Sequence, residues 1–174
     1  MKNIVLACKP EQINIKLQPV LSQQGFWVES VCSNASALLS TAQKMQYGVA
    51  VCTNFKDIPS LALPELLPRG FSLILLLSSG QFVPQGSSNL LTINLPLKRD
   101  DFITAVKLLA ISSSQDLYGI EPKAEDDEKI ILNAKKILMS RYNMSESDAH
   151  RFIQKKSMDC SVKLVDMARF VLAD

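Results

Sequence analysis

The sequence has few of the residues on which enzymes and metal sites depend. It contains one histidine, His150, and four cysteines that lie far apart without any Cys-x-x-Cys pair. A catalytic triad needs its histidine beside a nucleophile and an acid, and a structural zinc site needs four closely spaced Cys or His ligands. No glycine-rich phosphate-binding loop of either common pattern occurs. The sequence therefore predicts no enzyme, no metal site and no cofactor.

Long apolar runs are also missing. The longest, residues 73–77, is far too short to cross a bilayer. Residues 1–3 lead into a short apolar segment and then polar residues, which is not the pattern of a signal peptide. We therefore expect a cytoplasmic protein with reduced thiols and no membrane partner.

Charge is distributed unevenly along the 174 residues, although the net charge is only +2. Residues 116–128 contain six acidic residues and one lysine, whereas residues 129–174 contain nine Lys or Arg and five Asp or Glu. An acidic connector before a basic tail is typical of nucleic-acid binders. Solvated helix faces give similar counts, so charge alone leaves both interpretations open.

Short apolar segments alternate with helical patterns through the first two thirds of the chain. Because the expected strands are uniformly apolar, they predict a parallel sheet covered by helices on both faces. Five such units in about 110 residues favour an α/β flavodoxin-like fold with strand order 2-1-3-4-5. The expected strands are 4–8, 26–32, 48–52, 71–77 and 90–95, and the expected helical segments are 12–24, 36–45, 61–67 and 101–111.

The tail is predicted to be all-α, with three helices. The first restarts near Ala124, the second is capped by Ser145 with Asp148 three residues later, and the third begins near Ser161. We expect domains at 1–111 and 124–174, joined by a linker at 112–123. The residues expected to be buried in the last two helices are Ala149, Phe152, Ile153, Leu164, Val165, Ala168, Val171 and Leu172.

The predicted sheet resembles response-regulator receiver domains, and Leu95-Pro96-Leu97 resembles the end of their fifth strand. The resemblance implies an acidic pair for Mg²⁺, an aspartate phosphoacceptor, a Ser or Thr, and a Lys. Only Ser78 and Pro96 match the receiver pattern, and Asp57 lies several residues too late to be the acceptor. The corresponding positions here are Cys8, Lys9, Thr53 or Asn54, Ser78 and Leu95.

We therefore expect a pseudo-receiver without a phosphoacceptor, whose input is a sensor protein or a small-molecule ligand. A flavodoxin-like domain without regulatory ancestry is the alternative.

Residues 125–173 resemble the ANTAR family, the RNA-binding output modules of bacterial transcription antiterminators. The resemblance implies binding to hairpin loops in nascent mRNA, so that a terminator cannot form. Two departures are Lys136, where the family often has glycine, and His150, where an aromatic residue is usual. The matching positions are Ala134, Lys135, Ile137, Leu138, Met139, Met144, Ser145, Glu146, Ala149, Arg151, Ile153, Lys156, Met158, Asp159, Lys163, Leu164 and Ala168.

Cationic and polar residues of this tail are the expected RNA contacts, because RNA is bound through phosphates, 2′-hydroxyls and loop bases. The alternative for each cation is a solvated helix face. The predicted RNA-binding residues are Lys135, Lys136, His150, Arg151, Lys155, Lys156, Ser157 and Lys163.

The first tail helix is also predicted to form a homodimer. Ile130, Ala134 and Ile137 recur at spacings of four and three, which suits a coiled-coil seam or a bundle face. A scaffold that dimerises through this helix and binds no nucleic acid is the main alternative function. A DNA-binding regulator is disfavoured because the tail lacks a clear helix-turn-helix pattern.

Overall fold

The computed structural model describes residues 3–45, 47–59, 62–78, 89–110 and 127–173. The chain divides into two compact units, Met1–Ala110 and Ile111–Asp174. The linker predicted at 112–123 and the helix start predicted near Ala124 lie outside the described residues.

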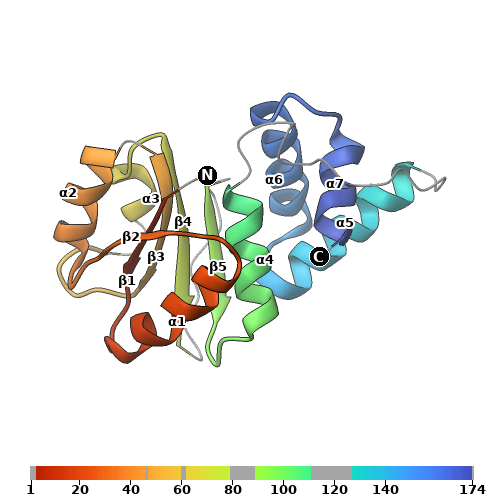
Figure 1. Cartoon of the computed structure of the whole chain (residues 1–174). Coiled ribbons are helices and arrows are strands. Elements are labelled where there is room, and N and C mark those ends of the chain that lie inside the picture. The colour runs from red at the N-terminus through yellow and green to blue at the C-terminus, as the bar shows by residue number, and fades with distance from the viewer. Residues whose placement is uncertain (1–2, 46, 60–61, 79–88, 111–126, 174) are drawn as a thin grey trace. The chain divides into compact units, whose positions relative to one another are not determined.

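The first unit is built on a five-stranded parallel sheet, which confirms the predicted fold class and strand order. Its order is β2-β1-β3-β4-β5 (Figure 1). Each strand begins and ends within two residues of its predicted bounds. The strands are β1 (Ile4–Ala7), β2 (Val28–Val31), β3 (Tyr47–Thr53), β4 (Gly70–Leu77) and β5 (Leu90–Asn94).

Helices cover both faces of this sheet, as its apolar strands require. α1 (Gln12–Gln23) and α4 (Arg99–Ala110) pack together on one face, and α2 (Ala35–Met45) packs against β1 and β3 on the other (Figure 1). The short α3 (Leu63–Leu66) contributes the buried Leu63 to the α2 face. The central strands are therefore buried on both sides.

Gly48 marks a close approach inside this sheet. A Cβ atom at this position would lie 2.7 Å from the carbonyl oxygen of Asn3 and 2.9 Å from the ring of Phe71. Such contacts are shorter than side chains tolerate, so only glycine fits between the neighbouring strands here.

The second unit contains three helices, α5 (Asp127–Tyr142), α6 (Glu146–Asp159) and α7 (Leu164–Ala173). All three contact one another. α6 buries Ala149, Phe152 and Ile153, as predicted from its period.

The third helix begins later than predicted. α6 ends in a Schellman motif: Ser161 adopts a positive φ of 56°, and the N–H groups of Ser161 and Val162 donate to the carbonyls of Met158 and Ser157. Ser161 therefore closes α6 instead of opening α7. Met167 is fully buried with Ala168 and Val171, whereas the predicted core residues Leu164, Val165 and Leu172 are only half-buried.

Two residues of the predicted dimer seam lie in the core of this unit. Ile130 and Ala134 are fully buried, in line with Leu138 and Tyr142 at successive spacings of four. α5 makes its main contacts with α7 of the same chain. Ile130 and Ala134 therefore stabilise the helical unit itself, and Ile137 is half-buried at the side of that line.

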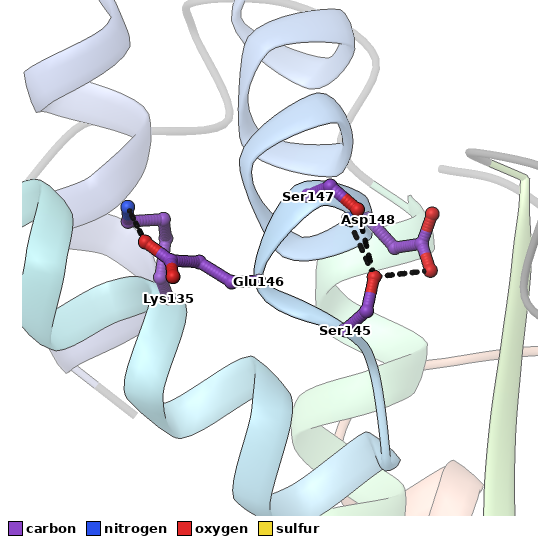
Figure 2. A network of polar contacts seen from close by, with 5 residues as sticks. All are labelled: Lys135, Ser145, Glu146, Ser147 and Asp148. Carbon is purple, nitrogen blue, oxygen red and sulfur yellow. Dashed lines mark hydrogen bonds and ion pairs between the residues drawn. The ribbon is translucent and has the colours of Figure 1, made fainter.

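The start of α6 is fixed by a side-chain cap (Figure 2). The Ser145 hydroxyl oxygen accepts a hydrogen bond from the Asp148 N–H at 3.2 Å and donates to the Asp148 carboxylate at 2.7 Å. The Ser147 hydroxyl lies 2.9 Å from the Ser145 hydroxyl. Ser145 thus satisfies an N–H that has no partner inside the helix.

We expect Ser145→Ala to destabilise the helical unit by about 1 kcal/mol, because the Asp148 N–H loses its acceptor. Native-state hydrogen exchange of the α6 amides in the full chain measures this change, since it reports one unit independently of the other. Ser140→Ala is the matched control, because the exposed Ser140 hydroxyl donates only to the Ile137 carbonyl of its own helix. Equal protection of α6 in the two variants would contradict the capping role.

Candidate nucleic-acid interface

α6 divides into a buried side and an exposed side. Opposite its core residues, His150, Arg151, Gln154 and Lys155 are all exposed. Met158 belongs to the same side, because it follows Gln154 by four residues and Lys155 by three, and it is 71% exposed. The exposed side of α6 therefore combines two cations, two hydrogen-bonding groups and an apolar side chain.

Two predicted contacts are not on this surface. Lys156 and Ser157 are buried, with exposures of 5% and 6%, and the Ser157 hydroxyl donates to the Gln154 carbonyl at 2.7 Å. Their position follows from helical geometry, because Lys156 and Ser157 each lie four residues after a core residue, Phe152 and Ile153. Both side chains therefore lie toward the core of the helical unit, and their contact with RNA stays an untested prediction.

Lys135 is engaged within the protein. Its ammonium lies 2.7 Å from the Glu146 carboxylate, and Figure 2 shows this pair joining α5 to the first turn of α6. Hydrogen bonding from Lys135, together with its charge, lowers the pKa of the Glu146 carboxyl. Lys135 therefore positions α6, and its charge is already opposed by a carboxylate.

Lys136 and Lys163 are exposed cations on the other two helices. The carbonyl of Lys163 accepts the first N–H bonds of α7, from Asp166 and Met167, so Lys163 stands at the N-terminus of that helix. A cation at this end opposes the helix dipole, which costs roughly 0.3–1 kcal/mol. Helix stability therefore does not explain the charge of Lys163.

Arg169, which was not among the predicted site residues, has a structural role. Its guanidinium lies 3.5 Å from the Asp127 carboxylate on α5 and 3.2 Å from the Asp166 carboxylate on α7. The spacing of three residues from Asp166 was a signal for one of these pairs. By contrast, Lys136, Arg151, Lys155 and Lys163 have no ion-pair partner within the described part of the chain.

The receiver positions lie at the carboxyl ends of the strands of the first unit. The Cys8 N–H donates to the buried Asn14 side chain at 3.0 Å, and burial raises the pKa of the Cys8 thiol to about 12. The Lys9 N–H donates to the Thr53 hydroxyl at 2.8 Å. Thr53 thus ties the ends of β1 and β3 together, and Cys8 stays a neutral thiol.

The remaining receiver positions stand at the ends of β4 and β5. Ser78 is exposed directly after β4, and the Leu95 N–H donates to the Leu77 carbonyl at 2.7 Å. Asp57 accepts hydrogen bonds from the N–H and hydroxyl of Ser36 at 3.2 and 3.3 Å. Among the described residues, no group of three or more His, Cys, Asp or Glu side chains could hold a metal ion.

Comparison with known proteins agrees with the division of the chain into two units. Residues 123–172 match the ANTAR domain family. A response regulator receiver domain protein from Bacillus halodurans is 16% identical, with a TM-score of 0.54 over 64% of this chain and 98% of that chain. A signal receiver domain of a modulated diguanylate cyclase from Desulfovibrio desulfuricans is 15% identical, with a TM-score of 0.51 over 63% and 93%.

A structure of RcsB from Salmonella enterica serovar Typhimurium, bound to a promoter, is 14% identical, with a TM-score of 0.53 over 98% of each chain. At these identities the likeness concerns the fold. No curated protein matches this chain.

No helix in the described ranges is both long and apolar enough to cross a membrane. The receiver-like fold of the first unit and the ANTAR match of the second together form a non-enzymatic architecture. The chain thus consists of a receiver-like domain followed by an ANTAR domain.

Proposed function

We propose that this protein is a transcription antitermination regulator that binds hairpin loops in nascent mRNA and so prevents a terminator from forming. The observation that carries the proposal is the exposed basic side of α6 within the segment that matches the ANTAR family. A protein that binds one RNA fold more tightly than the competing fold shifts the equilibrium between them by the difference in binding free energy.

The chemistry of this side suits RNA. Arg151 and Lys155, four residues apart, supply charges for phosphates, and His150 and Gln154 supply hydrogen bonds. The exposed Met158 offers an apolar contact for an unstacked loop base. Lys136 and Lys163 extend the positive charge onto the other helices, whereas Lys135 acts by holding α6 in place.

We also propose that the receiver-like domain works without aspartyl phosphorylation. Mg²⁺ requires oxygen ligands, but Cys8 is a buried neutral thiol and Lys9 brings a positive charge to the end of β1. Thr53 and Asn54 stand where the acceptor carboxylate is needed. The input to this domain is then a sensor protein or a small-molecule ligand.

We also propose that the protein is a homodimer, but with a different contact from the predicted seam of Ile130, Ala134 and Ile137. Leu132 and Met139, seven residues apart on one side of α5, are 43% and 37% exposed. This spacing repeats after two helical turns, so the two apolar side chains lie in one line along α5, with the exposed Lys136 between them. We propose that this line, rather than Ile130 and Ala134, meets a second copy of the chain.

We expect Arg151→Ala to weaken binding to hairpin RNA by about 1–3 kcal/mol, and Lys155→Ala to reduce the salt dependence of binding by about one unit of slope. The RNA is selected from hairpins with randomised loops, and affinities are measured against salt concentration with the full chain. Arg99→Ala, which removes an exposed arginine from the receiver-like domain, is the matched control.

A folded Arg151/Lys155 double alanine variant that binds the selected hairpin as tightly as the natural chain would contradict RNA binding by α6. A natural chain that binds no hairpin would favour the scaffold. Tighter binding of duplex DNA than of hairpin RNA would favour a DNA-binding regulator.

Acetyl phosphate or beryllofluoride with Mg²⁺ should leave the receiver-like domain unmodified and structurally unchanged, because Cys8 and Lys9, Thr53 or Asn54, and Leu95 replace the groups that would hold the metal and the phosphoryl group. Intact mass and amide NMR shifts test this. Asp57→Asn serves as the control, since Asp57 is the acid nearest in sequence to the end of β3. Stoichiometric acid-labile phosphate on the natural chain would refute the proposal, and its loss in Asp57→Asn would identify the acceptor.

Sedimentation velocity at tens of micromolar should show a dimer that Leu132→Lys weakens, because a charge would replace an apolar contact. Ile15→Lys is the matched control: Ile15 is another exposed apolar residue, on α1 of the receiver-like domain. A monomeric natural chain, or an unchanged dimer in Leu132→Lys, would rule out this contact.

A further inference from the structure

A cavity of about 550 Å³ opens at the carboxyl edge of the parallel sheet. Its lining follows the ends of three strands: Lys9 comes after β1, Asn34 after β2, and residues 54–57 after β3. The strand order reverses at β1, which lies between β2 and β3. In doubly wound sheets this is the position at which ligands bind, and the volume suits a small molecule.

The cavity carries two available positive charges. Lys9 and Lys56 are exposed, and neither has an ion-pair partner within the described part of the chain. The one acid of the lining, Asp57, is bound by the N–H and hydroxyl of Ser36 at the start of α2. Desolvation works in the opposite direction, but these hydrogen bonds keep the pKa of Asp57 below its usual range. The acid thus stays ionised at the N-terminus of α2, where the helix dipole favours it.

The other lining groups add hydrogen bonding and an apolar wall. The Asn34 side-chain oxygen accepts from the Ala37 N–H at 2.7 Å, so its NH₂ group is left as a donor without a partner in the described ranges. Phe55 is half-buried and packs against the core on the α2 side of the sheet. The cavity therefore has cations, an amide donor and an aromatic surface that the core holds in place.

We propose that this cavity binds a small organic phosphate that carries an aromatic or apolar group. Lysine ammonium groups are common phosphate ligands, and here Lys9 and Lys56 attract the anion while Phe55 contacts the apolar part. A bare phosphate would leave the Phe55 wall unused, and an uncharged ring would leave both lysines without a partner. This site lies on the receiver-like domain and does not depend on RNA binding by α6.

The test uses the full chain with two probes of this class, 1-naphthyl phosphate and AMP, and with inorganic phosphate and adenosine as partial ligands. Isothermal titration calorimetry measures affinity, and amide NMR shifts locate the site. We expect saturable 1:1 binding of at least one aromatic phosphate, tighter than either partial ligand, with shifts at Lys9 and residues 54–57.

Lys56→Ala should weaken that binding about tenfold or more, because a charged hydrogen bond is lost. Lys44→Ala is the matched control: Lys44 is an exposed lysine in the last turn of α2, away from the cavity at its first turn. The inference is overturned if neither aromatic phosphate binds saturably at millimolar concentration. It is also overturned if Lys56→Ala binds as tightly as Lys44→Ala, or if inorganic phosphate or adenosine binds as tightly as the aromatic phosphate.

Discussion

The sheet of the receiver-like domain is covered on both faces, and this constraint determines where the domain can carry chemistry. β3 and β4 are buried along almost their whole length, so their side chains are committed to packing. Functional groups must therefore stand beyond the strand ends, at the carboxyl edge. The fold fixes that place, but the residues at the place fix the chemistry. Here the edge presents Lys9 and Lys56, which attract an anion and repel a metal ion.

The ANTAR domain obeys a similar constraint at a smaller scale. Each of its three helices gives one side to a shared core, so only the opposite sides can meet a partner. The Ser145 cap and the Lys135–Glu146 pair fix how α6 begins, and Arg169 ties α7 to α5. A recognition surface on a helix fixed in this way loses little conformational freedom on binding, which favours affinity.

The sheet could be predicted well because strands buried on both faces are continuous apolar runs, which differ clearly from the polar segments between them. The Ser145 cap was predictable for a related reason, since capping depends on a local residue pair. The burial of Lys156 follows from its helical position and not from its residue type: a lysine three residues after Ile153 and four after Phe152 lies on the core side. The start of α7 was missed because a serine at positive φ has no reliable sequence signal.

The apolar line of α5 shows a further limit of sequence patterns. Spacings of three and four predict that a helix face is buried, but they do not say whether the partner is another helix of the same chain or a second copy. Ile130 and Ala134 are buried in the three-helix core. The small helical unit needs them there, because small domains bury little surface. The receiver resemblance placed Lys9 and Asn54 at the ends of their strands, but the cavity that they line together with Asn34 and residues 55–57 was not predicted.

Two sites on two compact units communicate only through a coupling free energy, and such coupling is reciprocal. If an organic phosphate at the sheet edge raised RNA affinity by about tenfold, RNA would raise the affinity for that phosphate by the same factor. A ligand bound equally well with and without RNA would instead mean that one chain carries two independent functions. Reciprocity thus separates an input domain from a mere neighbour, and it does so without any assumption about how the two units are arranged.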